Sequence, residues 1–119
     1  MIFVSLINMK HYAYSKVAAA AVTTYNSTGT TMRVLIPKDE APHFIMRRFE
    51  VAPGGSIGVH SHPEEHEIYV LEGELQLVDG AGKKEKVAAS EFVFVPSNES
   101  HGYANEGNKP AAFICVIPK

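Results

Sequence analysis

The chain has one cysteine, no tryptophan and no long block of charge of either sign among its 119 residues. The single cysteine, Cys115, cannot form a disulfide within the chain, which is typical of a reducing compartment, so we expect a cytoplasmic protein. The formal net charge is -2, with acidic and basic residues interspersed. Because no basic patch is available to neutralise phosphates, nucleic acid is excluded as an expected partner.

Long apolar runs are also missing. A membrane helix requires roughly 20 apolar residues, so we expect no interaction with a membrane. The segment VAAAAV (17–22) is shorter than the apolar part of a signal peptide, and we do not expect it to act as one. A chain of this length suits one domain, which can bury roughly two-thirds of its surface and fold without disulfides or a structural metal.

Helical periodicity is absent after Thr31, where the apolar residues come in short groups rich in β-branched and aromatic side chains. Turn-forming segments such as PKDEAP (37–42), APGGS (52–56) and DGAGK (79–83) separate these groups. Short strands divided by turns are typical of an all-β sandwich or barrel. The pattern predicts strands at residues 33–36, 44–51, 67–71, 75–78, 91–95 and 111–117.

The N-terminal third is less regular. Residues 1–7 read as a strand whose continuous apolar character implies burial on both faces or against another chain. Residues 15–24 fit either one helical turn or extended chain, and the β-branched residues 22–24 favour extended chain. We therefore divide the chain into an N-terminal extension (1–31), which could form a dimer, and a β-barrel domain (32–119).

Three of the six histidines lie in the stretch HSHPEEH (60–66). Side chains alternate along a strand, so His60 and His62 project to the same side and form half of a site for a transition metal. A solvated surface pair is the alternative, but the third histidine argues against it. Pro63 bends the chain, which would allow either His66 or Glu67 to turn back toward the first pair.

Two motifs in this region resemble the cupin superfamily. The first is Gly54-x5-His60-x-His62-x3-His66-x6-Gly73, and the second is Pro96-x-Asn98-x2-His101-x3-Asn105. Two glycines of the family pattern are replaced: Ser90 stands ahead of Pro96, where a glycine usually opens the second motif, and Asn98 replaces the glycine within it. Asparagine tolerates left-handed backbone better than most residues, so we expect Asn98 to preserve the local geometry. The detailed match is similar to small manganese-containing cupins that use four histidines.

The resemblance implies a single cupin-type β-barrel, an antiparallel double-sheet jelly roll with little helix. It also implies a metal site formed by His60, His62, His66 and His101, with His66 selected over Glu67 by the six residues that precede Gly73. The expected cofactor is a divalent transition metal, manganese first and iron next, with zinc, nickel or copper as alternatives.

Three further residues are candidates for contact with a small-molecule substrate. Arg47 could point inward to a substrate carboxylate, with a surface charge as the alternative. Cys115 and Tyr103 could lie in the metal pocket, with core packing as the alternative. The expected function is that of a metal-dependent oxidoreductase, resembling a dioxygenase that activates O2 or peroxide. A non-redox lyase or isomerase acting on a small sugar or keto acid, and a non-catalytic ligand-binding or sensor protein, are the alternatives.

We also predict a homodimer, because small cupins commonly dimerise and the apolar residues 1–7 could pair with the sheet edge of a second copy. Sedimentation velocity at micromolar concentration should show a dimer. A monomer under these conditions would contradict the prediction.

Overall fold

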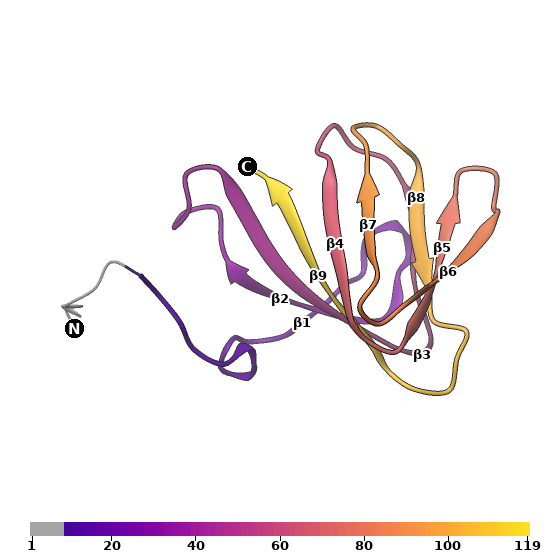
Figure 1. Cartoon of the computed structure of the whole chain (residues 1–119), viewed down its shortest axis with the longest axis horizontal. Helices are drawn as coiled ribbons and strands as arrows, with labels where there is room; N and C mark the ends of the chain where they lie inside the picture. The colour runs from indigo at the N-terminus through magenta and orange to yellow at the C-terminus, as the bar shows by residue number, and fades with distance from the viewer. Residues whose placement is uncertain (1–8) are drawn as a thin grey trace.

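Antiparallel β-strands dominate residues 9–119, the part of the chain that the computed structural model describes. Within it the helices are two single 3-10 turns, η1 (Tyr14–Lys16) and η2 (Thr24–Asn26), and none is long and apolar enough to cross a membrane. The strands form a nearly closed barrel (Figure 1). They are β1 (Ala20–Ala21), β2 (Thr28–Ile36), β3 (Phe44–His60), β4 (His66–Glu72), β5 (Glu74–Asp79), β6 (Lys84–Ala88), β7 (Phe92–Val95), β8 (His101–Ala104) and β9 (Ala111–Pro118).

The all-β fold expected from the sequence is confirmed, and each of the six predicted strands falls in a strand of the barrel. The sequence pattern missed β6 and β8. The first reads KEKVA, and because only Val87 among its residues is buried, it has no apolar group that would predict a strand. The second reads HGYA, which is short and contains a glycine, and it is held in the sheet by neighbours on both sides.

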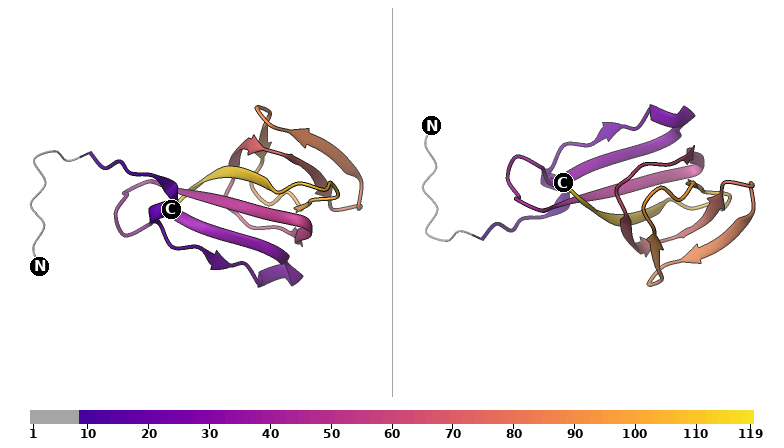
Figure 2. Two further views of the ribbon diagram at one scale, coloured as in Figure 1. Left: turned by 90° about the horizontal axis from the view of Figure 1, so that it is seen from below. Right: turned by 90° about the horizontal axis from the view of Figure 1, so that it is seen from above.

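The barrel consists of two sheets that share one long strand. The hydrogen-bonded order is β6-β5-β8-β3-β9-β4-β7, and β2 also pairs with β3. The first half of β3 pairs with β9 from Phe44 to Val51, whereas its last residues pair with β8 from Ser56 to His60. Figure 2 shows the resulting layers, with β2, β3 and β9 on one side and β5, β6 and β8 on the other. This is the double-sheet jelly roll expected.

The passage of β3 between the two sheets depends on a bulge at residues 52–55. The prediction that a turn at residues 52–56 separates two strands was wrong, because β3 continues through this segment. Opposite it on β2, Thr30 pairs with Val51 and Thr28 already pairs with Ser56, so the extra residues loop out of register. Gly54 has φ +81, and a Cβ on Gly55 would lie 2.8 Å from the carbonyl oxygen of Gly29. Both glycines are therefore required by the backbone.

Asn105 fastens this bulge from the end of the second motif. Its backbone exchanges two 2.9 Å hydrogen bonds with Gly54 and Gly55. Its side-chain amide, which is 1% exposed, donates to the carbonyl oxygens of Val51 at 2.9 Å and Lys109 at 2.8 Å. The side-chain oxygen accepts a bond from the backbone of Gly107 at 3.0 Å. Asn105 thus satisfies backbone groups of two loops at once.

The core fills the barrel between the two sheets. Phe49 and Phe113 stack with ring centroids 5.0 Å apart, and the Tyr103 ring lies 5.3 Å from Phe113. Inward and outward side chains alternate along β4, where Ile68 and Val70 are buried while Tyr69 and Leu71 are exposed. The apolar core stops below the end of the barrel that carries the histidines, and a cavity begins there.

The N-terminal part combines both alternatives considered for residues 15–24, because η1 and the start of η2 flank the two-residue strand β1. β1 pairs with β2, so this segment follows the barrel wall. The proposed division at residue 31 falls within β2. The strand predicted at residues 1–7 lies outside the described residues, and the homodimer remains a prediction.

Replacement of Asn105 by alanine should lower the free energy of unfolding by about 2–4 kcal/mol. The change removes three hydrogen bonds, one of which is donated to the carbonyl oxygen of the fully buried Val51. Urea unfolding measures the loss. Asn108→Ala is the matched control, because Asn108 is exposed on the same loop and should change stability little. Equal stability of the two variants would contradict the anchoring role of Asn105.

Candidate metal centre and its cavity

Two of the predicted ligands face each other across neighbouring strands. His60 ends β3 and His101 begins β8, and the two residues are direct partners in the ladder. Their ring centroids lie 4.5 Å apart. His60 and His101 lie about a third of the chain apart in sequence, and the two motifs therefore meet through strand register.

Hydrogen bonds between two loops place His62 beside this pair. The backbone N–H of Asn98 donates to the carbonyl oxygen of His62 at 2.8 Å, and the Ser97 hydroxyl donates to the carbonyl oxygen of Pro63 at 2.5 Å. Asn98 has φ +66, which confirms the left-handed conformation expected from its place in the motif. Ser90 also adopts positive φ, at +73, although it lacks the freedom of a glycine.

The alternation along β4 separates the two candidates for the third position. His66 is buried and faces the other histidines, with its ring centroid 4.3 Å from that of His62 and 5.2 Å from that of His101. Glu67 is exposed on the opposite face of the strand. The structure thus brings His66 into the cluster and leaves Glu67 outside it.

Backbone carbonyl oxygens fix the tautomers of three of these histidines. A carbonyl oxygen can only accept, so Nδ1 carries the proton in His60, bonded to Gly58 at 2.7 Å, and in His101, bonded to Glu99 at 2.8 Å. The same holds for His62, whose Nδ1 donates to Glu64 at 2.8 Å. Nε2 is then unprotonated in each ring, as a metal ligand requires.

The spacing of the donor atoms fits one ion. One ligand atom from each of His60, His62 and His101 lies within 4.8 Å of the others. Two nitrogens at about 2.1 Å from a shared ion would lie about 3–4 Å apart, so a small contraction would bring these three into a first coordination shell. His66 falls outside this tightest group of three and lies at its edge.

Burial favours the neutral form of His60, His66 and His101, and it leaves two imidazole nitrogens without a partner. Desolvation, reinforced by the neighbouring histidines, lowers the pKa of His66 to about 3. Burial likewise lowers the pKa of His60 and of His101. Within the described chain, Nδ1 of His66 and Nε2 of His101 are buried and form no hydrogen bond. Orphaned neutral nitrogens of this kind fit a divalent cation as the missing partner.

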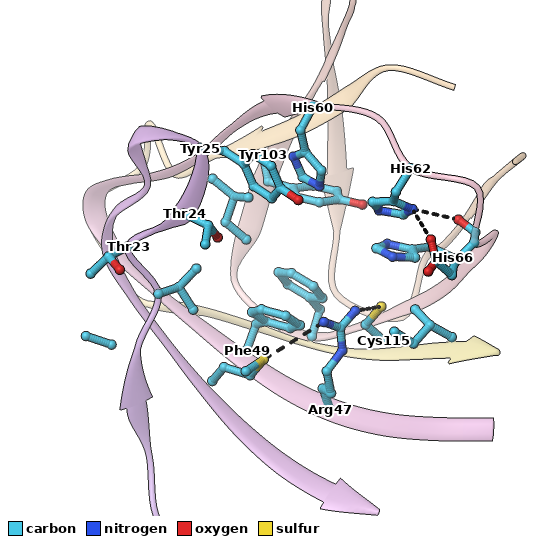
Figure 3. Close-up of a pocket in the computed structure, with 17 residues that line it drawn as sticks. Thr23, Thr24, Tyr25, Arg47, Phe49, His60, His62, His66, Tyr103 and Cys115 are labelled. Carbon is cyan, nitrogen blue, oxygen red and sulfur yellow. Dashed lines mark hydrogen bonds and ion pairs between the residues drawn. The ribbon is translucent and has the colours of Figure 1, made fainter. Parts of the chain in front are cut away.

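A cavity of about 390 Å³ opens beside the histidines (Figure 3). Its floor is formed by aromatic and aliphatic side chains of β3, β8 and β9, including Phe49, Ile57 and Phe113. Ligand cavities of this size with mostly apolar walls and a few polar groups are typical of small-molecule sites.

Arg47 points into this cavity from β3, in agreement with the inward orientation proposed from the sequence and not with a surface charge. Its guanidinium donates from Nη2 to the Cys115 sulfur at 3.3 Å and lies 5.1 Å from the centroid of the Phe49 ring. Its Nε is buried without a hydrogen bond, and no carboxylate of residues 9–119 lies within ion-pair distance of it. The neighbouring Arg48, by contrast, pairs with Glu50 and Glu72.

Cys115 and Tyr103 also line the cavity. Burial raises the pKa of the Cys115 thiol, so the sulfur is a neutral acceptor for Arg47 rather than a thiolate nucleophile. Burial raises the pKa of the Tyr103 phenol as well, and its hydroxyl has no partner in the described chain. Tyr103 can therefore donate a hydrogen bond to a ligand, whereas Cys115 is packed in the wall.

Sequence reasoning missed one wall of the cavity. Residues 21–25 line it from the N-terminal side, with the Tyr25 ring stacked on His60 at a centroid distance of 3.9 Å. The only sequence signal was Gly58, where a Cβ would lie 1.8 Å from the carbonyl oxygen of Tyr25. A glycine inside a strand marks close approach of another backbone, but it does not say which one.

Comparison with known proteins agrees with this geometry. The cupin domain family matches residues 47–117. The tetracenomycin polyketide synthase protein TcmJ of Streptomyces glaucescens is 31% identical over 108 residues, which cover 88% of this chain and 72% of that protein. The polyketide cyclase RemF of Streptomyces resistomycificus is 38% identical, with a TM-score of 0.86 over 92% of this chain and 79% of that one. The oxalate-binding protein of Thermotoga maritima is 39% identical over 74 residues, 61% of this chain and only 60% of that protein.

The double variant His60→Ala/His101→Ala should lose the metal that the purified wild type carries, because it removes two facing imidazoles. Elemental analysis after dialysis measures the metal content and identifies the metal. The control His11→Ala/His43→Ala removes two exposed histidines and should retain the wild-type content. Stoichiometric metal in the first double variant would refute the assignment.

His66→Ala should weaken metal binding and Glu67→Ala should not, and the reverse result would make Glu67 the third ligand.

Proposed function

The chain belongs to the cupin family, and from this premise we propose that it is a metal-dependent enzyme that cyclises a small anionic polyketone. The observation that carries the proposal is the unpaired Arg47 guanidinium in an apolar cavity beside four clustered imidazoles. A cation without a carboxylate partner is costly in such a site unless a ligand supplies the negative charge.

The relatives support this choice of substrate. RemF is described as a polyketide cyclase and TcmJ as a polyketide synthase protein, and both align over about nine-tenths of this chain. A third relative is named for binding oxalate, which is a dianion. Poly-β-ketones are acidic between their carbonyl groups, so they share with oxalate the ability to present negatively charged oxygens.

The proposed reaction is an intramolecular aldol condensation. A C–H bond between two carbonyls loses its proton, and the resulting enolate carbon bonds to a second carbonyl carbon of the same molecule. That carbonyl oxygen takes up a proton and becomes a hydroxyl group. The attacking carbon then loses its second proton and the hydroxyl group leaves with a proton as water, which forms a C=C double bond, so no oxidant is needed. A divalent cation held by His60, His62, His66 and His101 would supply positive charge that favours the enolate.

The protein's own groups orient the substrate. Arg47 would donate to a carboxylate or enolate oxygen, and the Tyr103 hydroxyl, kept protonated by its raised pKa, would donate to a carbonyl oxygen. Phe49, Ile57 and Phe113 would exclude water and hold the chain folded on itself. Cys115 supports Arg47 by accepting its hydrogen bond.

The oxidoreductase expected from the sequence is the second candidate. Four neutral imidazoles without a carboxylate also suit redox-active manganese or iron. The two candidates differ in their need for O2. Cyclisation at equal rates in air and under argon supports the aldol reaction, whereas consumption of O2 with the substrate supports the oxidoreductase.

Substitution of Arg47 by methionine should weaken the binding of a β-keto acid to the metal-loaded protein by about 10–100-fold, the range for a charged hydrogen bond. The probe is benzoylacetate, with its neutral methyl ester as the matched ligand, and calorimetry measures both affinities. Wild type should prefer the acid, and Arg47→Met should lose about 10–100-fold of that preference while its affinity for the ester stays nearly unchanged. Lys86→Met, which removes an exposed charge from β6, should retain the preference. Equal binding of acid and ester by wild type would refute the role of Arg47.

A further inference from the structure

We propose that Tyr25 is a positioning residue of the metal centre, which holds His60 in its ligand orientation through the segment at residues 21–26, here called the strap. The inference rests on the metal site of the proposed function, but not on the reaction performed there. It assigns a role to a part of the chain that precedes the barrel domain proposed from the sequence.

The stack between Tyr25 and His60 is close and parallel. The ring centroids lie 3.9 Å apart, and the ring planes differ by 2° (Figure 3). The hydrogen bond from Nδ1 of His60 to the carbonyl oxygen of Gly58 restricts rotation of the imidazole within its own plane. The stack on Tyr25 restricts tilting of the ring out of that plane. His60 is thus constrained both in its plane and across its face.

The backbone conformation of the strap places the Tyr25 ring against His60. Tyr25 and Asn26 both adopt left-handed conformations, with φ of +57 and +58. Positive φ is unfavourable for a bulky residue such as tyrosine, and it persists only where the surroundings require it. Here the carbonyl group of Tyr25 occupies the space that a side chain on Gly58 would fill. Gly58 therefore leaves room for the strap beside it, and its carbonyl oxygen accepts the hydrogen bond from His60.

Metal binding should strengthen the stack. An imidazole that donates its lone pair to a cation becomes electron-poor, and the electron-rich face of a phenol ring attracts it, as in a cation–π contact. An aliphatic side chain of similar size would cover His60 without this attraction. A comparison of aromatic and aliphatic residues at position 25 therefore distinguishes the effect of an aromatic ring from the effect of side-chain size alone.

The test measures Zn²⁺ affinity by competition with a chromophoric chelator. Tyr25→Leu should weaken binding by about tenfold, a typical loss when a group that supports a ligand is removed. Tyr25→Phe keeps the ring and should remain within about twofold of wild type. Tyr12→Leu is the matched control, because Tyr12 is 53% exposed, close to the 50% of Tyr25, and lies outside the cavity.

Gly58→Ala should also remove the stack between Tyr25 and His60, since the new methyl group would displace the strap. It should lose affinity as Tyr25→Leu does, and the double variant should lose no more than either single one. Thermal unfolding of each metal-free variant confirms that it is folded.

Zn²⁺ affinity of Tyr25→Leu within twofold of wild type would overturn the inference while leaving the metal site intact. Equal losses in Tyr25→Leu and Tyr25→Phe would also overturn it, because the hydroxyl rather than the stack would then be responsible. Failure of the wild type to bind Zn²⁺, Mn²⁺ or Fe²⁺ would overturn both this inference and the proposed function.

Discussion

The site depends on the bulge that lets β3 serve both sheets. Before the bulge, β3 pairs with β9 and carries Arg47 and Phe49; after it, the strand pairs with β8 and carries His60. The looped-out residues would leave backbone groups unpaired. The backbone of Asn105 satisfies groups of Gly54 and Gly55, and its side chain donates to Val51 just before the bulge. His60 and His101 are partners in the β3–β8 ladder, after a second irregularity between Ile57 and His60, and this register brings the two motifs together.

Electrostatics explain why this end of the barrel is suited to a cation and an anion together. Desolvation makes protonation of the buried imidazoles unfavourable, so the cluster offers lone pairs and no charge of its own. Arg47 then stands alone as a positive group on the cavity wall. Neutral ligands would leave a divalent ion with its full charge, and the two positive groups together would favour a ligand with negatively charged oxygens.

The sequence predicted those parts of the site that follow from alternation and motif spacing. The buried face of His66 and the exposed face of Glu67 follow from the period of two along β4. The left-handed conformation of Asn98 follows from its residue type. The bulge was mistaken for a turn, because Pro53, Gly54 and Gly55 favour both and only the pairing of β3 on either side distinguishes them. Tyr25 could not be predicted, since its contact with His60 joins segments 35 positions apart with no shared periodicity.

The same strand now links the two functions assigned to the cavity. Arg47, which would bind the anion, and His60, which would bind the metal, both belong to β3, while the strap contacts Gly58, which lies between them in sequence. A shift of the strand's second half relative to its first would change the separation between metal and guanidinium, and therefore the size of anion that could bridge them. The bulge sets the separation of the two backbone positions from which Arg47 and His60 extend. Selectivity for the length of the substrate would then depend on the path of β3 as well as on the side chains that line the cavity.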